Sequence, residues 1–184
     1  KTVLSAENLL VKILKRAKEL SLSGTELFAT PALSLFLKNN FNKKDFTSQK
    51  ELLNQFVLLD DYDIMASVKV WTQSDDKILA LLCSSLIDRS LYKIELQNTK
   101  FSASYIKTLQ EKIMKKYKVS KKETEYFVFS NSVINSAYNS SEIKINILYN
   151  DGKLLDVAKA SDQLNIKMLS KKVTKYFMCF PKNL

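Results

Sequence analysis

Residues 58–93, LLDDYDIMASVKVWTQSDDKILALLCSSLIDRSLYK, decide the fold of this chain. Two apolar runs follow each other, and each begins after acidic or hydroxyl side chains, at residues 60–63 and 74–76. Such side chains accept hydrogen bonds from the unpaired N–H groups of a helix's first turn, where the helix dipole also favours negative charge. The stretch therefore predicts two helices, the second ending near Arg89.

Helical signals fill the rest of the first 90 residues. Apolar side chains recur at helical spacing from the start to about residue 22, where Gly24 predicts the end of the helix. Thr30-Pro31 predicts the start of a second helix, and Ser48 with Glu51 has the pattern of a capping box for a third. With a polar connector at residues 39–44, we expect about five helices before residue 90.

Beyond residue 90 the pattern changes to that of strands. Residues 91–96, 126–129, 142–149, 153–157 and 173–180 have strand signatures, and Asn150-Asp151-Gly152 predicts a tight turn. Helices are expected to open at Ser102 and at Ser161 or Asp162. The predicted fold class is α+β: an N-terminal helical part of about five helices, followed by a small, mainly antiparallel sheet with two helices. We assign residues 1–90 to the helical region and 91–184 to an α+β C-terminal lobe.

Composition sets the broad class of the protein. Of the 184 residues 46% are hydrophobic, and only two are Gly and two Pro, which favours a folded chain with a real core. Cys83 and Cys179 lie among apolar neighbours, without a CxxC pair or any histidine, so we expect buried thiols in a reducing compartment and no zinc site. No apolar run approaches the ~20 residues of a membrane span, and we expect a cytoplasmic protein.

The net charge of +10 raises the question of a nucleic-acid partner. Only Arg16 and Arg89 are arginines, so the other 27 of the 29 basic residues are lysines, which are the usual charges of solvated faces. A basic run could follow a phosphate backbone, although a solvated helix end is the favoured interpretation. We therefore keep a basic nucleic-acid-binding module only as the alternative function. The run consists of Lys112, Lys115, Lys116, Lys118, Lys121 and Lys122.

The same 58–93 stretch resembles the HD-superfamily phosphohydrolases, in particular the branch similar to deoxynucleoside triphosphate triphosphohydrolases. In that family an LDDYDI…W helix is followed by a shorter helix and an R-x-L-[FY]-K exit. A looser match covers residues 12–36, and Lys1-Thr2 resembles the end of a Y-x-H-K-T motif. The matching positions here are Asp60, Asp61, Tyr62, Asp63, Ile64 and Trp71, then Arg89, Leu91, Tyr92 and Lys93.

This resemblance implies that the chain is one part of an enzyme. The family's catalysis depends on histidines and aspartates that bind a divalent metal, and this chain has no histidine. We expect a longer parent whose N-terminal HD domain holds the metal and performs the hydrolysis, with the present chain as its C-terminal portion. No catalytic or metal-binding residue is assigned to this chain. Its expected partners are that HD domain and further copies of itself, and not a membrane.

The resemblance also implies a nucleotide surface. In nucleotide-regulated members, the Arg and Lys of R-x-L-[FY]-K contact the phosphates of an activating nucleotide at a subunit interface, and the Lys of Y-x-H-K-T serves the same site. Arg89, Lys93 and Lys1 are thus the expected effector-binding residues, and Lys182 is a weaker candidate. From the residues alone, Arg89 could instead satisfy the free carbonyls of a helix end.

Two further features have a structural interpretation beside a functional one. The carboxylates at residues 60–63 could hold a metal, but their spacing is what a helix N-terminus needs, and we favour capping. Trp71 shares a helix with apolar neighbours and is expected to lie in the core rather than to bind a ligand.

Overall fold

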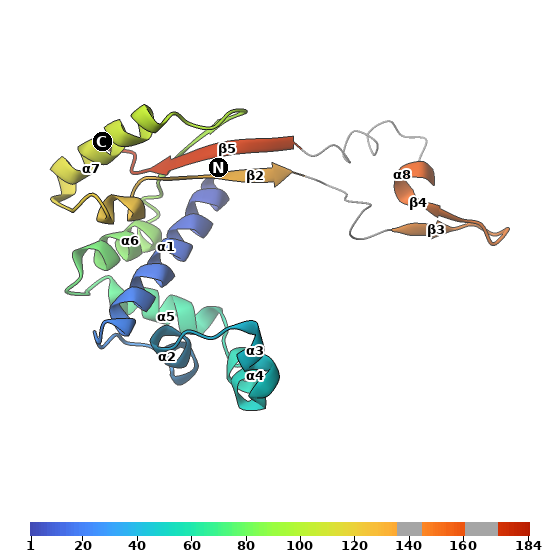
Figure 1. Ribbon diagram of the computed structural model, residues 1–184, viewed down its shortest axis with the longest axis horizontal. Helices are drawn as coiled ribbons and strands as arrows, with labels where there is room; N and C mark the ends of the chain where they lie inside the picture. Colours follow the sequence, from blue (N-terminus) through green and yellow to red (C-terminus); the bar gives the residue numbers. More distant parts are fainter. Residues whose placement is uncertain (136–144, 161–172) are drawn as a thin grey trace. The chain divides into compact units, whose positions relative to one another are not determined.

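The computed structural model describes residues 1–135, 145–160 and 173–184 (Figure 1). The chain divides into two compact units. Residues 1–94, 106–129 and 179–184 form the first unit, and residues 95–105 and 130–178 form the second. The predicted boundary at residues 90 and 91 refers to the domains of a parent protein, and it stays a prediction.

Helices account for most of the chain before the first strand, so the predicted N-terminal helical part is confirmed (Figure 1). Residues 1–92 contain one helix more than the five expected, because residues 43–48 form a helix of their own. The bounds are α1 Thr2–Leu22, α2 Pro31–Lys38, α3 Lys43–Ser48, α4 Lys50–Val57, α5 Asp61–Trp71 and α6 Lys77–Ile87, followed later by α7 Ala103–Tyr117 and the 3-10 helix η1 Glu123–Tyr126.

The strands form two small antiparallel sheets, which confirms the α+β class. In the three-stranded sheet β5 Val173–Phe180 lies between β1 Lys93–Gln97 and β2 Phe129–Asn135. In the other sheet β3 Asn146–Leu148 pairs with β4 Leu154–Asp156. The predicted turn joins them: Gly152 has a φ of +80°, and its N–H donates to the Tyr149 carbonyl at 2.9 Å. The short helix α8 Val157–Ala160 follows β4.

The predicted strand at residues 126–129 is wrong. Residues 123–126 form η1, and β2 begins only at Phe129. Tyr126, Phe127 and Val128 are buried, and the strand preference of such residues largely measures how well they pack on a buried surface. Burial here is reached without a strand. Ser120 and Glu123 form the capping box that starts this segment, since Glu123 accepts from the Ser120 N–H at 2.8 Å.

The predicted capping box of Ser48 with Glu51 is also wrong. The box at this place is made by Asn42 and Asp45, which start α3 within the expected polar connector. The Ser48 hydroxyl instead donates to the Lys44 carbonyl at 3.1 Å, inside α3, and α4 begins without a side-chain cap. Ser48 could not cap a new helix because it is already the last residue of the preceding one.

Within the predicted capping residues 74–76, Asp76 is the cap of α6: it accepts from the Leu79 N–H at 2.8 Å, while Ser74 accepts from the Asp76 N–H. The first predicted strand starts at Lys93 instead of residue 91. The helix expected at residues 161 or 162, and the part of the 142–149 strand before residue 145, lie outside the described residues.

The core of the first unit is centred on α1. Its buried residues, Ser5, Leu9, Ile13 and Ala17, recur every four positions and therefore form one stripe along the helix. Helix α1 packs against α6 and α2, and α5 packs against α6 (Figure 1). On α6 the apolar side chains Ile78, Leu79, Leu82 and Cys83 are buried. Burial of this kind provides most of the stability of a small helical unit.

Two polar contacts tie α1 to the ends of the α6 segment. Near the C-terminal end of α1, Arg16 donates to both carboxylate oxygens of Asp76, at 3.0 and 2.6 Å. Near its N-terminal end, the buried Ser5 hydroxyl donates to the carbonyl of Tyr92 at 2.9 Å. Position 16 thus meets the start of α6 and position 5 meets the chain just after it. The two helices therefore run antiparallel.

The residues predicted to be structural lie in the core. Trp71 is 2% exposed, and its Nε1 donates to the Phe28 carbonyl at 2.9 Å. Cys83 and Cys179 are fully buried free thiols, and burial raises the pKa of each to about 12, so neither is a reactive thiolate. No helix in the described part of the chain is both long and apolar enough to cross a membrane.

The Arg16–Asp76 pair should give the stability of the chain a specific acid dependence. Burial alone would raise the pKa of Asp76, but hydrogen bonds from Arg16 and from the Leu79 N–H outweigh it, and the pKa lies below its usual value. The stabilisation is therefore complete above the unfolded-state pKa of about 3.9 and is lost as the pH falls through the lower folded-state pKa. Asp76→Asn, which keeps a good capping residue, should lower the free energy of unfolding at neutral pH by about 1 to 2 kcal/mol.

Urea unfolding of the wild type and this variant across the acid range is the measurement, and the gap between them should close as the pH falls below about 4. Asp75→Asn is the matched control, because Asp75 is the exposed neighbouring carboxylate and does not cap the helix. A gap that persists unchanged at acid pH would show that the charge of Asp76 is not what stabilises the pair.

Candidate functional site

A cavity of about 430 Å³ lies where the start of α1, the chain after α6 and the last residues of the protein come together. We call it the Arg89 cavity. Every residue predicted to bind an effector nucleotide lies on its wall, and the weaker candidate Lys182 does as well. All of its wall belongs to the first unit. The lining residues are Lys1, Thr2, Arg89, Leu91, Tyr92, Lys93, Ile94 and Lys182.

Arg89 reaches the cavity through an unusual backbone conformation. It follows Asp88, the C-terminal cap of α6, and has a φ of +55°. This left-handed position after a helix is usually held by glycine, and a residue with a Cβ costs roughly 1 kcal/mol or more there. Its N–H donates to the Leu86 carbonyl at 3.3 Å, which closes the helix end. The left-handed turn changes the direction of the chain, and Arg89 and Lys93 then line one wall.

The other cations are placed by the strands and by α1. Lys93 is the first residue of β1, and its ammonium lies 5.4 Å from the ring centre of Phe180, the last residue of β5. This contact accounts for the presence of Lys182, two residues further on, at the same cavity. Lys1 directly precedes α1, whose first turn is held at this end of α6 by the hydrogen bond from Ser5 to Tyr92.

The charges of the Arg89 cavity all have the same sign. Four of its lining side chains are basic, and none of the residues given for its wall is acidic. Like charges this close together repel, and an anion with several negative oxygens relieves that repulsion. A guanidinium offers a planar fork of donors to phosphate oxygens, and ammonium groups add point charges. The volume is also within the range of about 300 to 1,000 Å³ that small-molecule sites occupy.

The acidic residues 60–63 have the structural role that the sequence favoured. Asp60 accepts hydrogen bonds from the N–H groups of Tyr62 at 2.8 Å and Asp63 at 3.2 Å, and Asp63 accepts from the Asp60 N–H at 2.9 Å. This reciprocal pair is a capping box at the start of α5. Among the described residues, no three His, Cys, Asp or Glu side chains converge to hold a metal ion, so we derive no metal-dependent step from this chain.

The basic run at residues 112–122 lies on the end of α7 and the segment that follows it, and its lysines are exposed. Lys116 donates to the Asn183 carbonyl and lies 5.7 Å from the ring centre of Tyr117. None of these lysines lines the Arg89 cavity. Nucleic-acid binding by this face stays a hypothesis, which the salt dependence of DNA or RNA affinity would test.

Comparison with known proteins identifies one relevant similarity. No family model matches the chain, and no curated protein matches it. Among solved structures, the crystal structure of a phosphohydrolase from Bacteroides thetaiotaomicron is 39% identical and superposes with a TM-score of 0.85. The match covers 98% of this chain. This chain resembles part of a phosphohydrolase.

The chain spans 45% of the length of that phosphohydrolase. The predicted resemblance to phosphohydrolases is confirmed at this level. The placement in the HD superfamily, the C-terminal position in a parent and the nucleotide-binding role of Arg89, Lys93 and Lys1 stay predictions. The sequence had already named the four cations of the cavity, but only through the family motifs, because nothing in their spacing along the chain brings positions 1, 89, 93 and 182 together.

The hydrogen bond from Ser5 should contribute to stability because both partners are buried, with Ser5 at 1% and Tyr92 at 5% exposure. Ser5→Ala leaves the Tyr92 carbonyl without this donor and should lower the free energy of unfolding by roughly 1 to 2 kcal/mol in urea titrations. Ser85→Ala is the control, since the Ser85 hydroxyl bonds only within its own helix, to the Leu81 carbonyl. Equal unfolding midpoints for the two variants would exclude the proposed tie.

Proposed function

We propose that this chain is the C-terminal part of a cytoplasmic HD-type (deoxy)nucleotide phosphohydrolase. In this role it supplies contacts between subunits and a surface that binds an effector nucleotide through Arg89, Lys93 and Lys1. Hydrolysis, with its divalent metal, belongs to the HD domain of the same parent. The present chain has no histidine with which to build such a centre.

One observation carries the proposal: four basic side chains from the beginning, middle and end of the chain line one cavity without an acidic neighbour on its wall. A nucleoside triphosphate carries up to four negative charges on its phosphates, so its charge is complementary to that of the wall. Arg89 has the bidentate geometry suited to a phosphate, and the lysines neutralise the remaining oxygens. The half-buried Leu91 and the exposed Thr2, which also line the cavity, offer contact for a sugar or base.

The similarity to a solved phosphohydrolase supports the enzyme class of the parent. That protein is more than twice as long as the region matched here, which leaves room for a separate catalytic part. The resemblance of residues 58–93 to dNTP triphosphohydrolases supports nucleotides as the compounds involved. We therefore expect deoxyguanosine and guanosine triphosphates to be informative ligands for the Arg89 cavity.

Replacing Arg89 with glycine separates the two interpretations of this residue. Because glycine adopts a positive φ without strain, Arg89→Gly should leave the fold intact or stabilise it by about 1 kcal/mol. The same change removes a charge-assisted contact to phosphate and should weaken dGTP or GTP binding roughly tenfold or more. Calorimetric titration at low salt, with the chain or its full-length parent, measures the affinity, and thermal unfolding measures the stability.

Lys118→Gly is the matched control. Lys118 has the same φ of +55° after α7, but it does not line the Arg89 cavity. It should gain the same stability and keep its nucleotide affinity. If Arg89→Gly also keeps full affinity, Arg89 serves only the helix end, and the proposed nucleotide surface is wrong.

A further inference from the structure

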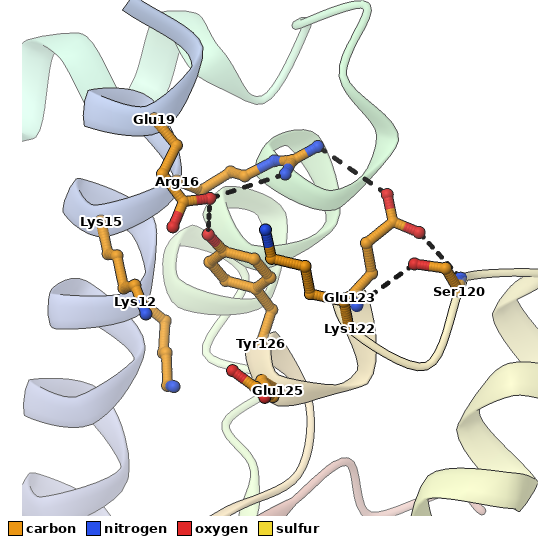
Figure 2. Close-up of a pocket in the computed structure, with 9 residues that line it drawn as sticks. All are labelled: Lys12, Lys15, Arg16, Glu19, Ser120, Lys122, Glu123, Glu125 and Tyr126. Carbon is orange, nitrogen blue, oxygen red and sulfur yellow. Dashed lines mark hydrogen bonds and ion pairs between the residues drawn. The ribbon is translucent and has the colours of Figure 1, made fainter. Parts of the chain in front are cut away.

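A second cavity, of about 230 Å³, lies between α1 and residues 120–126, and the proposed function does not use it (Figure 2). We call it the Lys12 cavity. Lys12, Lys15 and Arg16 reach it from α1, and Lys122 reaches it from the facing segment. Figure 2 shows the lysines on either side of the Tyr126 ring. All of these residues belong to the first unit.

Three carboxylates, Glu19, Glu123 and Glu125, also line this cavity, and the first two are already engaged by other groups. Glu19 accepts a hydrogen bond from the Tyr126 hydroxyl and lies 3.8 Å from Arg16 (Figure 2). Glu123 accepts from the Ser120 N–H, a contact that lowers its pKa, and lies 4.0 Å from Arg16. Arg16 in turn gives its two strongest hydrogen bonds to Asp76. These groups therefore largely satisfy one another.

Among the residues that the structure describes, the three lysines have no such carboxylate partner. No ion pair between described residues joins Lys12, Lys15 or Lys122 to a carboxylate within 4.0 Å. The Lys12 ammonium instead lies 4.7 Å from the ring centre of Phe129 and 6.0 Å from that of Tyr126. Burial, and then the charge of Lys15, lower its pKa, and Glu125, Cys179 and Glu19 offset this only in part. A partly buried ammonium beside another cation is a position that an anion would stabilise.

We propose that the Lys12 cavity binds a small phosphate-type oxyanion, such as orthophosphate or pyrophosphate, through Lys12, Lys15 and Lys122. Lysines on both walls can contact different oxygens of one tetrahedral group, and the Tyr126 and Phe129 rings shield the Lys12 contact from water. The volume is smaller than that of typical sites for nucleotide-sized ligands, which occupy about 300 Å³ or more. The cavity is therefore separate from the Arg89 cavity in both residues and ligand size.

Titration with sodium pyrophosphate at low ionic strength tests this proposal. The full 184-residue chain carries Arg89→Gly and Lys93→Ala as background, which removes two of the four cations of the Arg89 cavity and weakens its contribution. Adding Lys12→Gln and Lys15→Gln should weaken pyrophosphate binding at least about tenfold, which corresponds to 1.4 kcal/mol. Adding Lys112→Gln and Lys115→Gln instead removes the same charge from exposed positions outside both cavities and should change the affinity less than about twofold.

A second measurement needs no change in the Lys12 cavity itself. In the background variant, saturation with pyrophosphate should raise the pKa of Lys12, because a bound anion favours the charged ammonium. NMR of the Lys12 side chain measures this pKa. Equal affinity in the two lysine variants, absence of pyrophosphate binding, or an unchanged Lys12 pKa would each overturn the proposal. Binding of dGTP to the background variant more than about tenfold tighter than pyrophosphate would show that the cavity recognises more than phosphate. None of these results depends on whether the Arg89 cavity binds a nucleotide.

Discussion

The antiparallel pairing of α1 with α6 is the constraint on which the first unit depends. The stripe of buried residues along α1 provides apolar contact with α6, but such a stripe alone permits the two helices to slide along each other by a turn. The bidentate contact of Arg16 with Asp76 at one end, and the hydrogen bond from Ser5 to the Tyr92 carbonyl at the other, fix the register. Both contacts are directional and shielded from water, which makes them effective at selecting a single arrangement. The same pairing places α1 beside both cavities.

Much of the fold could be predicted from local signals. The Asp60 cap of α5, the Thr30-Pro31 start of α2 and the strand at residues 173–180 are all short-range patterns, and the structure has each of them. The errors occurred where two patterns overlapped. Asn42 and Ser48 both precede helical residues, and only Asn42 caps a helix. The buried residues from Tyr126 onward have strand preference, but the hydrogen-bonded pair of Ser120 and Glu123 begins a 3-10 turn just before them.

The candidate site was predictable in a more limited way. The family motifs predicted that Arg89, Lys93 and Lys1 belong to one site, whereas their meeting at one cavity depends on the helix pairing and on the neighbouring ends of β1 and β5. Lys122 of the Lys12 cavity belongs to the basic run noted in the sequence, but nothing in the sequence connects it with Lys12 and Lys15. The two walls of this cavity are more than 100 positions apart in the sequence. The sequence alone does not distinguish a lysine that lines a cavity from one that faces water. Only the three-dimensional arrangement distinguishes them.

The positive φ at Arg89 has a consequence for how this position changes over evolution. Stability alone favours glycine there, so random substitution and selection for folding both lead away from arginine. A lineage in which nothing binds at this place should lose the guanidinium within a modest number of substitutions. A lineage that keeps arginine retains a residue that is less stable than glycine in this backbone conformation. If Arg89 binds a ligand as proposed, the residue found at this one position in related chains would therefore record which of them bind one.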